Sequence, residues 1–272
     1  MSEPYVALIT GASAGIGEAT ARRLARDPGT HLVLVARRED RLNQLAGELP
    51  APSTVIAVDL TRDDAPATIR EALERQHGGR LHLLVNNAGA AWRGSFADTG
   101  WANVERHLKL NLEAPLRLAH DLLPMLRATA NDNTSGRRVA IVNVASTAAR
   151  VSRPNSGAYS VSKFALAGWN DALLGEEAPH GVHVGMVLPG FIRTEGFPAT
   201  ELLANPATRW IVSRPERVAE AIVEAGPGGK AERYVPRLYW LAAALRILAP
   251  RLVRRGTAGG AFTTATSAKT DD

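Results

Sequence analysis

The sequence predicts an α/β fold in which an open, doubly wound sheet of parallel strands is flanked by helices. Three observations support it: short continuous apolar runs, longer helical patterns between them, and a glycine-rich turn directly after the first run. Continuous apolar runs are typical of strands that are buried on both faces of a parallel sheet. In such folds ligands bind at the carboxyl ends of the strands.

The apolar runs predict strands, and the stretches between them predict crossover helices. The expected strands are residues 6–9, 32–35, 55–58, 81–85, 139–144 and 182–188. Ile16, Ala19 and Leu24 recur at helical spacing after the first run. The segment from Thr99 to Ala130 is long enough for two consecutive helices or one bent helix.

The chain divides into one large domain and a short carboxyl-terminal part. A length of 272 residues with 45% hydrophobic and 22% charged residues indicates a globular chain, and no mid-chain linker interrupts it. We expect a domain over residues 1–232, a basic apolar helical extension over 233–255, and a disordered tail over 256–272.

Composition excludes several classes of chemistry. The chain has no cysteine, which excludes disulfides and thiolate chemistry. Its seven histidines do not show the H-E-x-x-H spacing of a helical zinc site, so we expect no metal. The net charge is +5, but residues 233–255 hold six arginines and no acid, leaving −1 for the rest. We therefore expect no nucleic-acid partner.

The two ends of the chain bear on its location. The first ten residues lack the basic region and long apolar stretch of a signal peptide, which predicts a cytoplasmic protein. The longest apolar stretch, residues 238–245, is too short to span a bilayer. Tyr239 and Trp240 among aliphatic and arginine residues predict broken amphipathic helices, serving as a peripheral membrane contact, a lid or an oligomer contact.

The motif TGASAGIG, residues 10–17, joins the first strand to a helix. Gly11, Gly15 and Gly17 would let the backbone approach a pyrophosphate, and the helix terminus supplies free N–H groups. A tight turn without a ligand is the alternative.

The second strand ends in Arg37 and Arg38, where an NAD-binding fold carries an acid. A guanidinium fits a 2′-phosphate, so NADP(H) is the expected cofactor and NAD(H) the alternative. Both arginines could instead be solvated or pair with Glu39 and Asp40. Asp59, after the third strand, is expected at the adenine edge or as a helix cap.

A candidate reaction centre follows the fifth strand. Tyr159 and Lys163 are four residues apart in an expected helix and so share a face, where the ammonium would favour the phenolate. Ser146, 13 residues before Tyr159, could polarise a substrate carbonyl. Pro115 has no N–H for the carbonyl of Asn111, so that carbonyl could hold an ordered water, or the proline could simply bend the helix.

These motifs resemble those of the short-chain dehydrogenase/reductase family in order and spacing over about residues 5–225. The resemblance also includes NNAG at residues 86–89, YSVSK at 159–163, and Pro189, Gly190 and Thr194. The resemblance implies a Rossmann-type domain with about seven parallel strands and homodimers or homotetramers. It also implies a catalytic tetrad: Tyr159 as acid/base, Lys163 lowering its pKa and binding the nicotinamide ribose, Ser146 orienting the carbonyl, and Asn111 anchoring a water chain. The cofactor-binding residues implied are Gly11, Ser13, Gly15, Ile16, Gly17, Arg37, Arg38, Asp59, Leu60, Asn87, Ala88, Gly89, Tyr159, Lys163, Pro189, Gly190 and Thr194.

The expected activity is hydride transfer between NADP(H) and a carbonyl or secondary alcohol. Apolar side chains in residues 191–213, such as Phe191 and Phe197, favour a hydrophobic small molecule. The alternative is a dinucleotide-binding sensor or scaffold without catalysis, although such a protein would need neither Ser146 nor the Tyr159–Lys163 pair.

Overall fold

The computed structural model describes residues 3–195, 197, 199–206 and 209–258. Seven parallel strands form the main sheet in the order β3-β2-β1-β4-β5-β6-β9. The strands are β1 (Tyr5–Thr10), β2 (Thr30–Ala36), β3 (Ser53–Ala57), β4 (Leu83–Asn86), β5 (Ala140–Val144), β6 (His183–Pro189) and β9 (Glu232–Val235). A small second sheet pairs β7 (Phe191–Ile192) with β8 (Val212–Ser213). The predicted doubly wound parallel sheet is confirmed.

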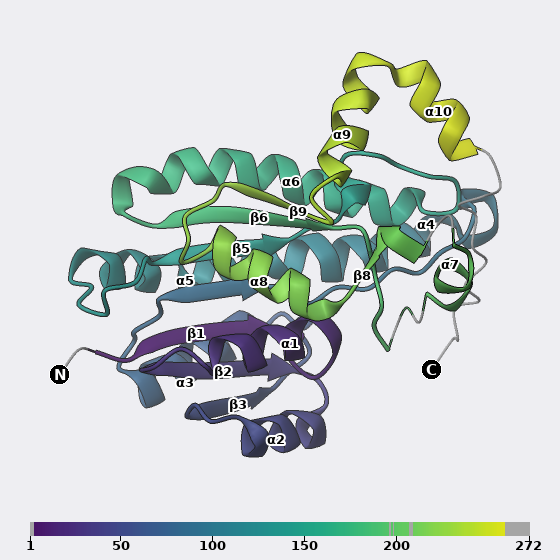
Figure 1. Ribbon diagram of the computed structural model, residues 1–272. Coiled ribbons are helices and arrows are strands. Elements are labelled where there is room, and N and C mark those ends of the chain that lie inside the picture. The colour runs from purple at the N-terminus through teal and green to yellow at the C-terminus, as the bar shows by residue number, and fades with distance from the viewer. Residues whose placement is uncertain (1–2, 196, 198, 207–208, 259–272) are drawn as a thin grey trace.

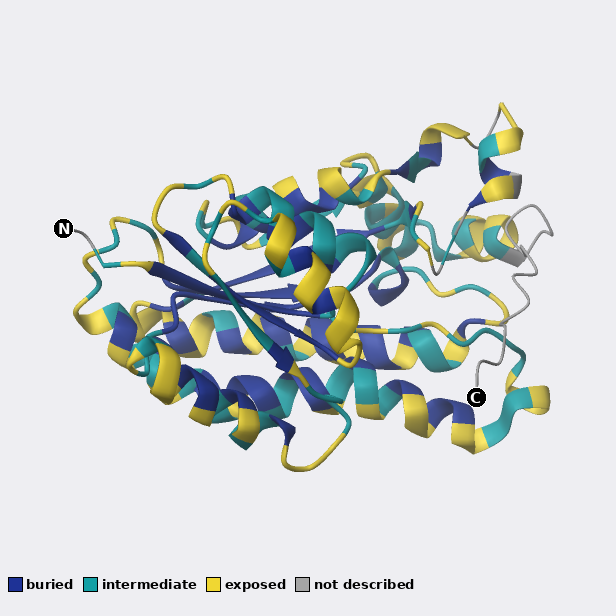
Figure 2. Ribbon diagram, turned by 90° about the horizontal axis from the view of Figure 1, so that it is seen from below, coloured by how far each residue is buried: buried dark blue, intermediate teal, exposed yellow. Residues whose placement is uncertain are grey.

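Helices cover both faces of the sheet, as Figures 1 and 2 show. One face packs against α1, α2 and α8, and the other against α3, α5 and α6. The helices are α1 (Gly15–Leu24), α2 (Glu39–Glu48), α3 (Ala65–His77), α4 (Phe96–Leu108), α5 (Ala114–Asn131), α6 (Gly157–Glu177), α7 (Thr200–Ala204), α8 (Pro215–Ala225), α9 (Tyr239–Leu248) and α10 (Pro250–Ala258).

The central strands are buried on both faces, which explains their continuous apolar runs. All six residues of β1 are buried, and its side chains alternate between two core clusters. Tyr5, Ala7 and Ile9 contact the α1 side, whereas Val6 and Leu8 contact the α3 and α5 side. The register of β1 with β2 and β4 brings their carboxyl ends to one edge.

The long segment after β4 forms two helices joined by a π-helical turn at Lys109–Glu113. The backbone N–H of Ala114 donates to the carbonyl oxygen of Lys109, five residues back. Pro115 has no N–H to continue the ordinary ladder, which accounts for the wider turn at this point. The backbone stays helical from Leu108 through this turn to Ala114, so α4 and α5 run on from each other with the π-helical turn between them.

The carboxyl-terminal part starts later than the sequence predicts. Residues 232–235 form β9, which pairs with β6, so the expected boundary at 233 falls inside the main sheet. β9 is an edge strand of Glu, Arg, Tyr and Val, and therefore lacks the apolar run that marks the buried strands. Residues 256–258, predicted in the tail, end α10, and the remainder of that tail lies outside the described residues.

Candidate active site

The glycine-rich loop lies between β1 and α1, as its sequence predicts. Gly11 and Gly15 have left-handed backbone conformations, with φ of +68° and +59°. Helix α1 begins at Gly15, and its N-cap residue, Ala14, makes no side-chain hydrogen bond to the first turn. The first-turn amides are therefore left for an anion at the carboxyl edge of the sheet.

Position 17 requires glycine, because the surrounding atoms leave no room for a β-carbon. A β-carbon on Gly17 would lie 2.2 Å from the carbonyl oxygen of Gly11 and 2.7 Å from Nδ2 of Asn87. Nδ2 of Asn87 donates to the carbonyl oxygen of Thr10 at 2.8 Å. Oγ1 of Thr10 accepts from the amides of Asn87 at 2.9 Å and Ala88 at 3.0 Å. The NNAG turn and the glycine loop thus form one unit.

Arg38 reaches from the end of β2 to this loop. Its Nη2 donates to the hydroxyl oxygen of Ser13 at 3.2 Å. Its Nη1 lies 3.9 Å from a carboxylate oxygen of Glu195. The guanidinium and the Ser13 hydroxyl therefore stand side by side at the position where a dinucleotide fold receives the adenosine ribose.

Asp59 and Leu60 follow β3 at the carboxyl edge of the sheet. Oδ1 of Asp59 accepts from the amide of Thr61 at 2.9 Å and from its hydroxyl at 2.8 Å, which is a turn cap. Burial raises the pKa of Asp59, but these bonds and the charge of Arg37 outweigh it, so the pKa is lowered. The side chain of Leu60 packs against the hydrophobic core.

Asn111 is buried in the π-helical turn and holds the loop after β4. Its Oδ1 accepts from the amide of Ala90 at 2.9 Å, and its Nδ2 donates to the Ala90 carbonyl at 2.9 Å and to Oγ of Ser162 at 3.2 Å. A β-carbon on Gly89 would lie 3.0 Å from Oδ1 of Asn111. The amide of Asn111 is thus used to position the NNAG turn beside α6.

Ser146 and Tyr159 lie together at the carboxyl end of β5. Oγ of Ser146 accepts from the amide of Ala148 at 3.1 Å and donates to the carbonyl of Pro189 at 3.4 Å. Burial raises the pKa of Tyr159. A hydrogen bond with Ser146 and the charges of Arg93 and Arg153 act in the opposite direction. Burial outweighs these effects, so the pKa of Tyr159 stays above its usual value.

Lys163 shares a helical face with Tyr159, but its ammonium binds the backbone. Nζ donates to the carbonyl oxygen of Val144 at 2.9 Å and lies 5.9 Å from the Tyr159 ring centroid. The residue is only 4% exposed, and burial lowers the pKa of its ammonium to about 8. The cations that lower the pKa of Tyr159 here are arginines, a feature that the sequence did not predict.

Two arginines without a motif stand over phenyl rings of the segment that follows β6, and a histidine lies beside Tyr159. The guanidinium carbon of Arg93 lies 5.3 Å from the Phe197 ring centroid, and that of Arg153 lies 4.8 Å from the Phe191 ring centroid. The two phenyl rings stack at 5.9 Å. The His107 ring lies 6.0 Å from the Tyr159 ring. Arg93 and Arg153 are single loop residues and His107 is a single residue of α4, so none of the three belongs to a motif with a recognisable spacing.

The carboxyl-terminal extension contacts the site directly. A β-carbon on Gly190 would lie 2.3 Å from Cε2 of Tyr239, the first residue of α9. The Tyr239 hydroxyl donates to the carbonyl of Ile211 at 3.2 Å. Thr194 lies over the glycine loop, since a β-carbon on Gly15 would be 3.3 Å from its Cγ2. Figure 1 shows α4, α7 and α9 on this side of the sheet.

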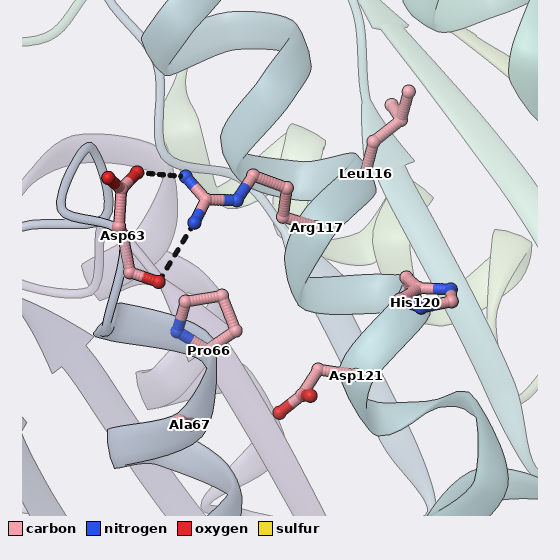
Figure 3. A pocket seen from close by; sticks show the side chains of 7 residues that line it. All are labelled: Asp63, Pro66, Ala67, Leu116, Arg117, His120 and Asp121. Atoms are coloured by element: carbon pink, nitrogen blue, oxygen red, sulfur yellow. Dashed lines mark hydrogen bonds and ion pairs between the residues drawn. The ribbon is translucent and has the colours of Figure 1, made fainter.

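A separate surface pocket lies between α3 and α5 (Figure 3). Its volume is about 420 Å³, and none of its lining residues belongs to the predicted site. Arg117 crosses it, with Nη1 2.9 Å from a carboxylate oxygen of Asp63.

Within the described ranges, no three His, Asp or Glu side chains are grouped so as to hold a metal ion.

Comparisons with known proteins decide the family. The profile described as short chain dehydrogenase matches residues 5–202. The chain belongs to the short-chain dehydrogenase family. As a member it is an NAD(P)-dependent oxidoreductase that acts on CH–OH or C=O groups. The glycine cradle and the uncapped start of α1 fit the pyrophosphate of such a cofactor.

Individual relatives and a solved structure agree with this family assignment. The chain is 32% identical over 266 residues to dehydrogenase/reductase SDR family member 7B of Xenopus laevis, covering 91% of this chain and 79% of that one. It is 33% identical over 221 residues to the ketoacyl reductase HetN of Nostoc, covering 80% of this chain and 74% of that one. A Sphingobium yanoikuyae short-chain dehydrogenase in complex with NADPH has a TM-score of 0.72 and 31% identity, covering 93% and 94%.

Proposed function

We propose that this protein is an NADP(H)-dependent carbonyl reductase, working also as an alcohol dehydrogenase in the reverse direction. The observation that carries the proposal is the convergence of Ser146, Tyr159 and Lys163 beside the glycine loop. Nicotinamide, when bound, supplies or accepts hydride. The side chains of the protein then have to orient the carbonyl and move one proton.

Tyr159 is the proposed general acid in reduction and base in oxidation. Ser146 already bonds to the phenol, so a carbonyl oxygen that accepts from both hydroxyls would be polarised. Lys163 is proposed to favour the phenolate and hold the nicotinamide ribose, and its buried ammonium can reorient from the Val144 carbonyl. Asn111 is proposed to position the neighbouring backbone for the proton path.

The proposed preference for NADP(H) over NAD(H) rests on Arg38 and Ser13. A 2′-phosphate could accept from the guanidinium and the hydroxyl together, which a ribose hydroxyl does less well. Arg37 adds positive charge nearby, acting on Asp59. The remaining cofactor contacts are proposed at the backbone of residues 11–17, 87–89 and 189–194.

The substrate is proposed to be a small carbonyl compound or alcohol with an apolar body. Phe191 and Phe197 line the wall beside Arg93 and Arg153, and both phenyl rings are half-buried. A purely cofactor-sensing role is not favoured, because it would leave the Ser146–Tyr159 hydrogen bond without a purpose.

The proposal is tested by NADPH consumption with a panel of ketones and aldehydes. Tyr159→Phe should lower kcat about 10²- to 10⁴-fold, the range of one general acid, while leaving NADPH affinity unchanged. Tyr5→Phe is the matched control, since the Tyr5 hydroxyl donates to the Arg138 carbonyl at the far end of β1. Turnover that survives in Tyr159→Phe would remove the phenol from the mechanism.

Helices α9 and α10 are proposed as a peripheral contact with an anionic membrane surface. Ile247 and Leu248 are each 80% exposed, and Leu252 is 64% exposed beside the arginines of this segment. The described part of the chain contains no helix long and apolar enough to cross a membrane. Co-sedimentation with phosphatidylserine vesicles, weakened by salt, tests the contact. We also propose that the protein is cytoplasmic and that it assembles as a homodimer or homotetramer.

A further inference from the structure

Three buried side chains of one helical segment hold the chain that follows the NNAG turn. Asn103, His107 and Asn111 are four residues apart, and each is no more than 4% exposed. Asn111 bonds to both backbone groups of Ala90. The amide of Trp92 donates to Nε2 of His107 at 3.0 Å, and its carbonyl accepts from Nδ2 of Asn103 at 3.3 Å. Both backbone groups of Trp92 are therefore fixed as well.

The imidazole of His107 has one hydrogen-bonding arrangement. Its Nδ1 lies 2.6 Å from the carbonyl oxygen of Asn103. A carbonyl can only accept, so Nδ1 carries the proton and Nε2 is the acceptor for the Trp92 amide. Burial lowers the pKa of His107, which favours this neutral form. Because both ring nitrogens are used by backbone groups, His107 serves to hold the chain and not to transfer a proton.

The indole of Trp92 is held by two further contacts. The guanidinium carbon of Arg106 lies 4.6 Å from its ring centroid, and Nε of Arg106 donates to Oδ1 of Asn103 at 2.8 Å. The His107 ring lies 4.9 Å from the indole, with the two planes at 78°. Trp92 is nevertheless only half-buried. A partly exposed aromatic residue whose backbone and ring are both fixed is suited to be a preformed ligand contact.

The same imidazole also adjoins the reacting phenol. The ring centroids of His107 and Tyr159 are 6.0 Å apart, with the planes at 65°. The indole of Trp92 and the phenol of Tyr159 thus share one neighbour. A small molecule whose carbonyl accepts from Tyr159 can therefore extend to the indole.

We propose that His107 is a positioning residue of the reductase reaction: by accepting from the Trp92 amide, it fixes the Trp92 indole as the contact for the apolar body of the substrate. This inference rests on the proposed reductase function and deepens it by naming the substrate class. Aromatic rings pack well against the face or edge of an indole, so the class is aryl ketones and the corresponding alcohols.

Binding to the NADP⁺-loaded protein tests the contact without turnover, because NADP⁺ has no hydride to give. By calorimetry, acetophenone should bind about two- to tenfold more tightly than cyclohexyl methyl ketone, which has the same carbon skeleton without an aromatic ring. Trp92→Leu, which keeps an apolar side chain, should remove this preference. If the wild-type protein binds the two ketones equally, or binds neither, the inference is overturned.

Variants of His107 test the positioning role. His107→Leu leaves the Trp92 amide without its acceptor, so the Kd and KM of acetophenone should rise about tenfold, with kcat and NADPH affinity unchanged within about threefold. His107→Gln, whose side-chain oxygen can replace Nε2 as acceptor, should recover most of this loss. If His107 acts through the indole, His107→Leu adds nothing further in the Trp92→Leu protein. Additive effects, or an unchanged KM in His107→Leu, would overturn the role.

The matched control is His82→Leu. His82 is also fully buried, and its Nδ1 accepts from a backbone amide, that of Val6, at 3.1 Å. It precedes β4, at the opposite edge of the sheet from the site. His82→Leu should therefore lower the unfolding temperature, as His107→Leu does, but leave KM unchanged. An equal rise of KM in both variants would reflect lost stability and would overturn the positioning role.

The same measurements separate this inference from the proposed function. If ketones are reduced but His107→Leu keeps the wild-type KM, the inference fails and the reductase function stands. If acetophenone binding depends on Trp92 and His107 as expected but no carbonyl consumes NADPH, the reductase function fails and the contact stands.

Discussion

The two halves of the site are built in different ways. The cofactor half consists of backbone turns held by glycines at fixed spacing, such as Gly11 and Gly17 packed against Asn87. The substrate half consists of isolated side chains, including Arg93 and Arg153 over two phenyl rings. Chemistry can thus be inferred from motifs, whereas selectivity has to be inferred from the assembled wall.

The largest expected effect is on the backbone half. Gly17→Ala places a β-carbon 2.2 Å from the Gly11 carbonyl oxygen, so the loop has to shift. A displacement of about 1 Å at a reacting site can lower the rate about 10²-fold. We expect the shifted loop to lower both NADPH affinity and turnover. Fluorescence titration of NADPH measures the affinity.

The control for this glycine is Gly168, which is exposed in α6 and has open space where its β-carbon would be. Gly168→Ala should leave NADPH affinity unchanged and stabilise the protein by about 0.5–1 kcal/mol, because alanine favours the helix. NADPH binding by Gly17→Ala at the wild-type level would show that the loop does not need its close packing.

The next effect tests whether one side chain sets cofactor choice within the backbone half. Arg38→Gln removes charge-assisted bonds worth about 1.5–3 kcal/mol, so KM for NADPH should rise about tenfold or more while KM for NADH stays constant. Arg41→Gln is the control, since Arg41 also approaches Glu195, at 4.0 Å, but does not form the Ser13 contact. An equal loss with both cofactors would contradict this role.

The smallest effect concerns Lys163, where the two halves meet. Its pKa of about 8 in the folded protein is below the value of 10.5 expected for an exposed lysine. The unfolded chain therefore binds more protons between about pH 8 and 10.5, and this group adds to stability as the pH rises through that window. Below it, burying the charged ammonium lowers the free energy of unfolding.

Lys163→Met removes this dependence. The free energy of unfolding of Lys163→Met minus that of wild type should be larger at pH 7 than at pH 10, by about 1–3 kcal/mol for a shift of this size, so the variant is relatively more stable at pH 7. Urea unfolding at both pH values measures the difference, in which the other titrating groups cancel. A difference that does not change with pH would contradict a lowered pKa.

How far the sequence predicts this molecule depends on the kind of feature. The buried parallel strands and the glycine loop follow from apolar runs and turn residues, and Pro115 indicates the break now found as a π-helical turn. The edge strand β9 is missed because the charged, partly buried Glu232 and Arg233 interrupt its apolar pattern. The contact of Tyr239 with Gly190 joins positions far apart in the chain, and no local pattern encodes it.

The most direct measurement follows the hydride itself. With NADPH deuterated at the transferred position and a ketone as substrate, the account predicts an alcohol that carries one deuterium at the former carbonyl carbon, at a rate strongly reduced in Tyr159→Phe. NADPH that binds but transfers no deuterium to any ketone or aldehyde would contradict the account.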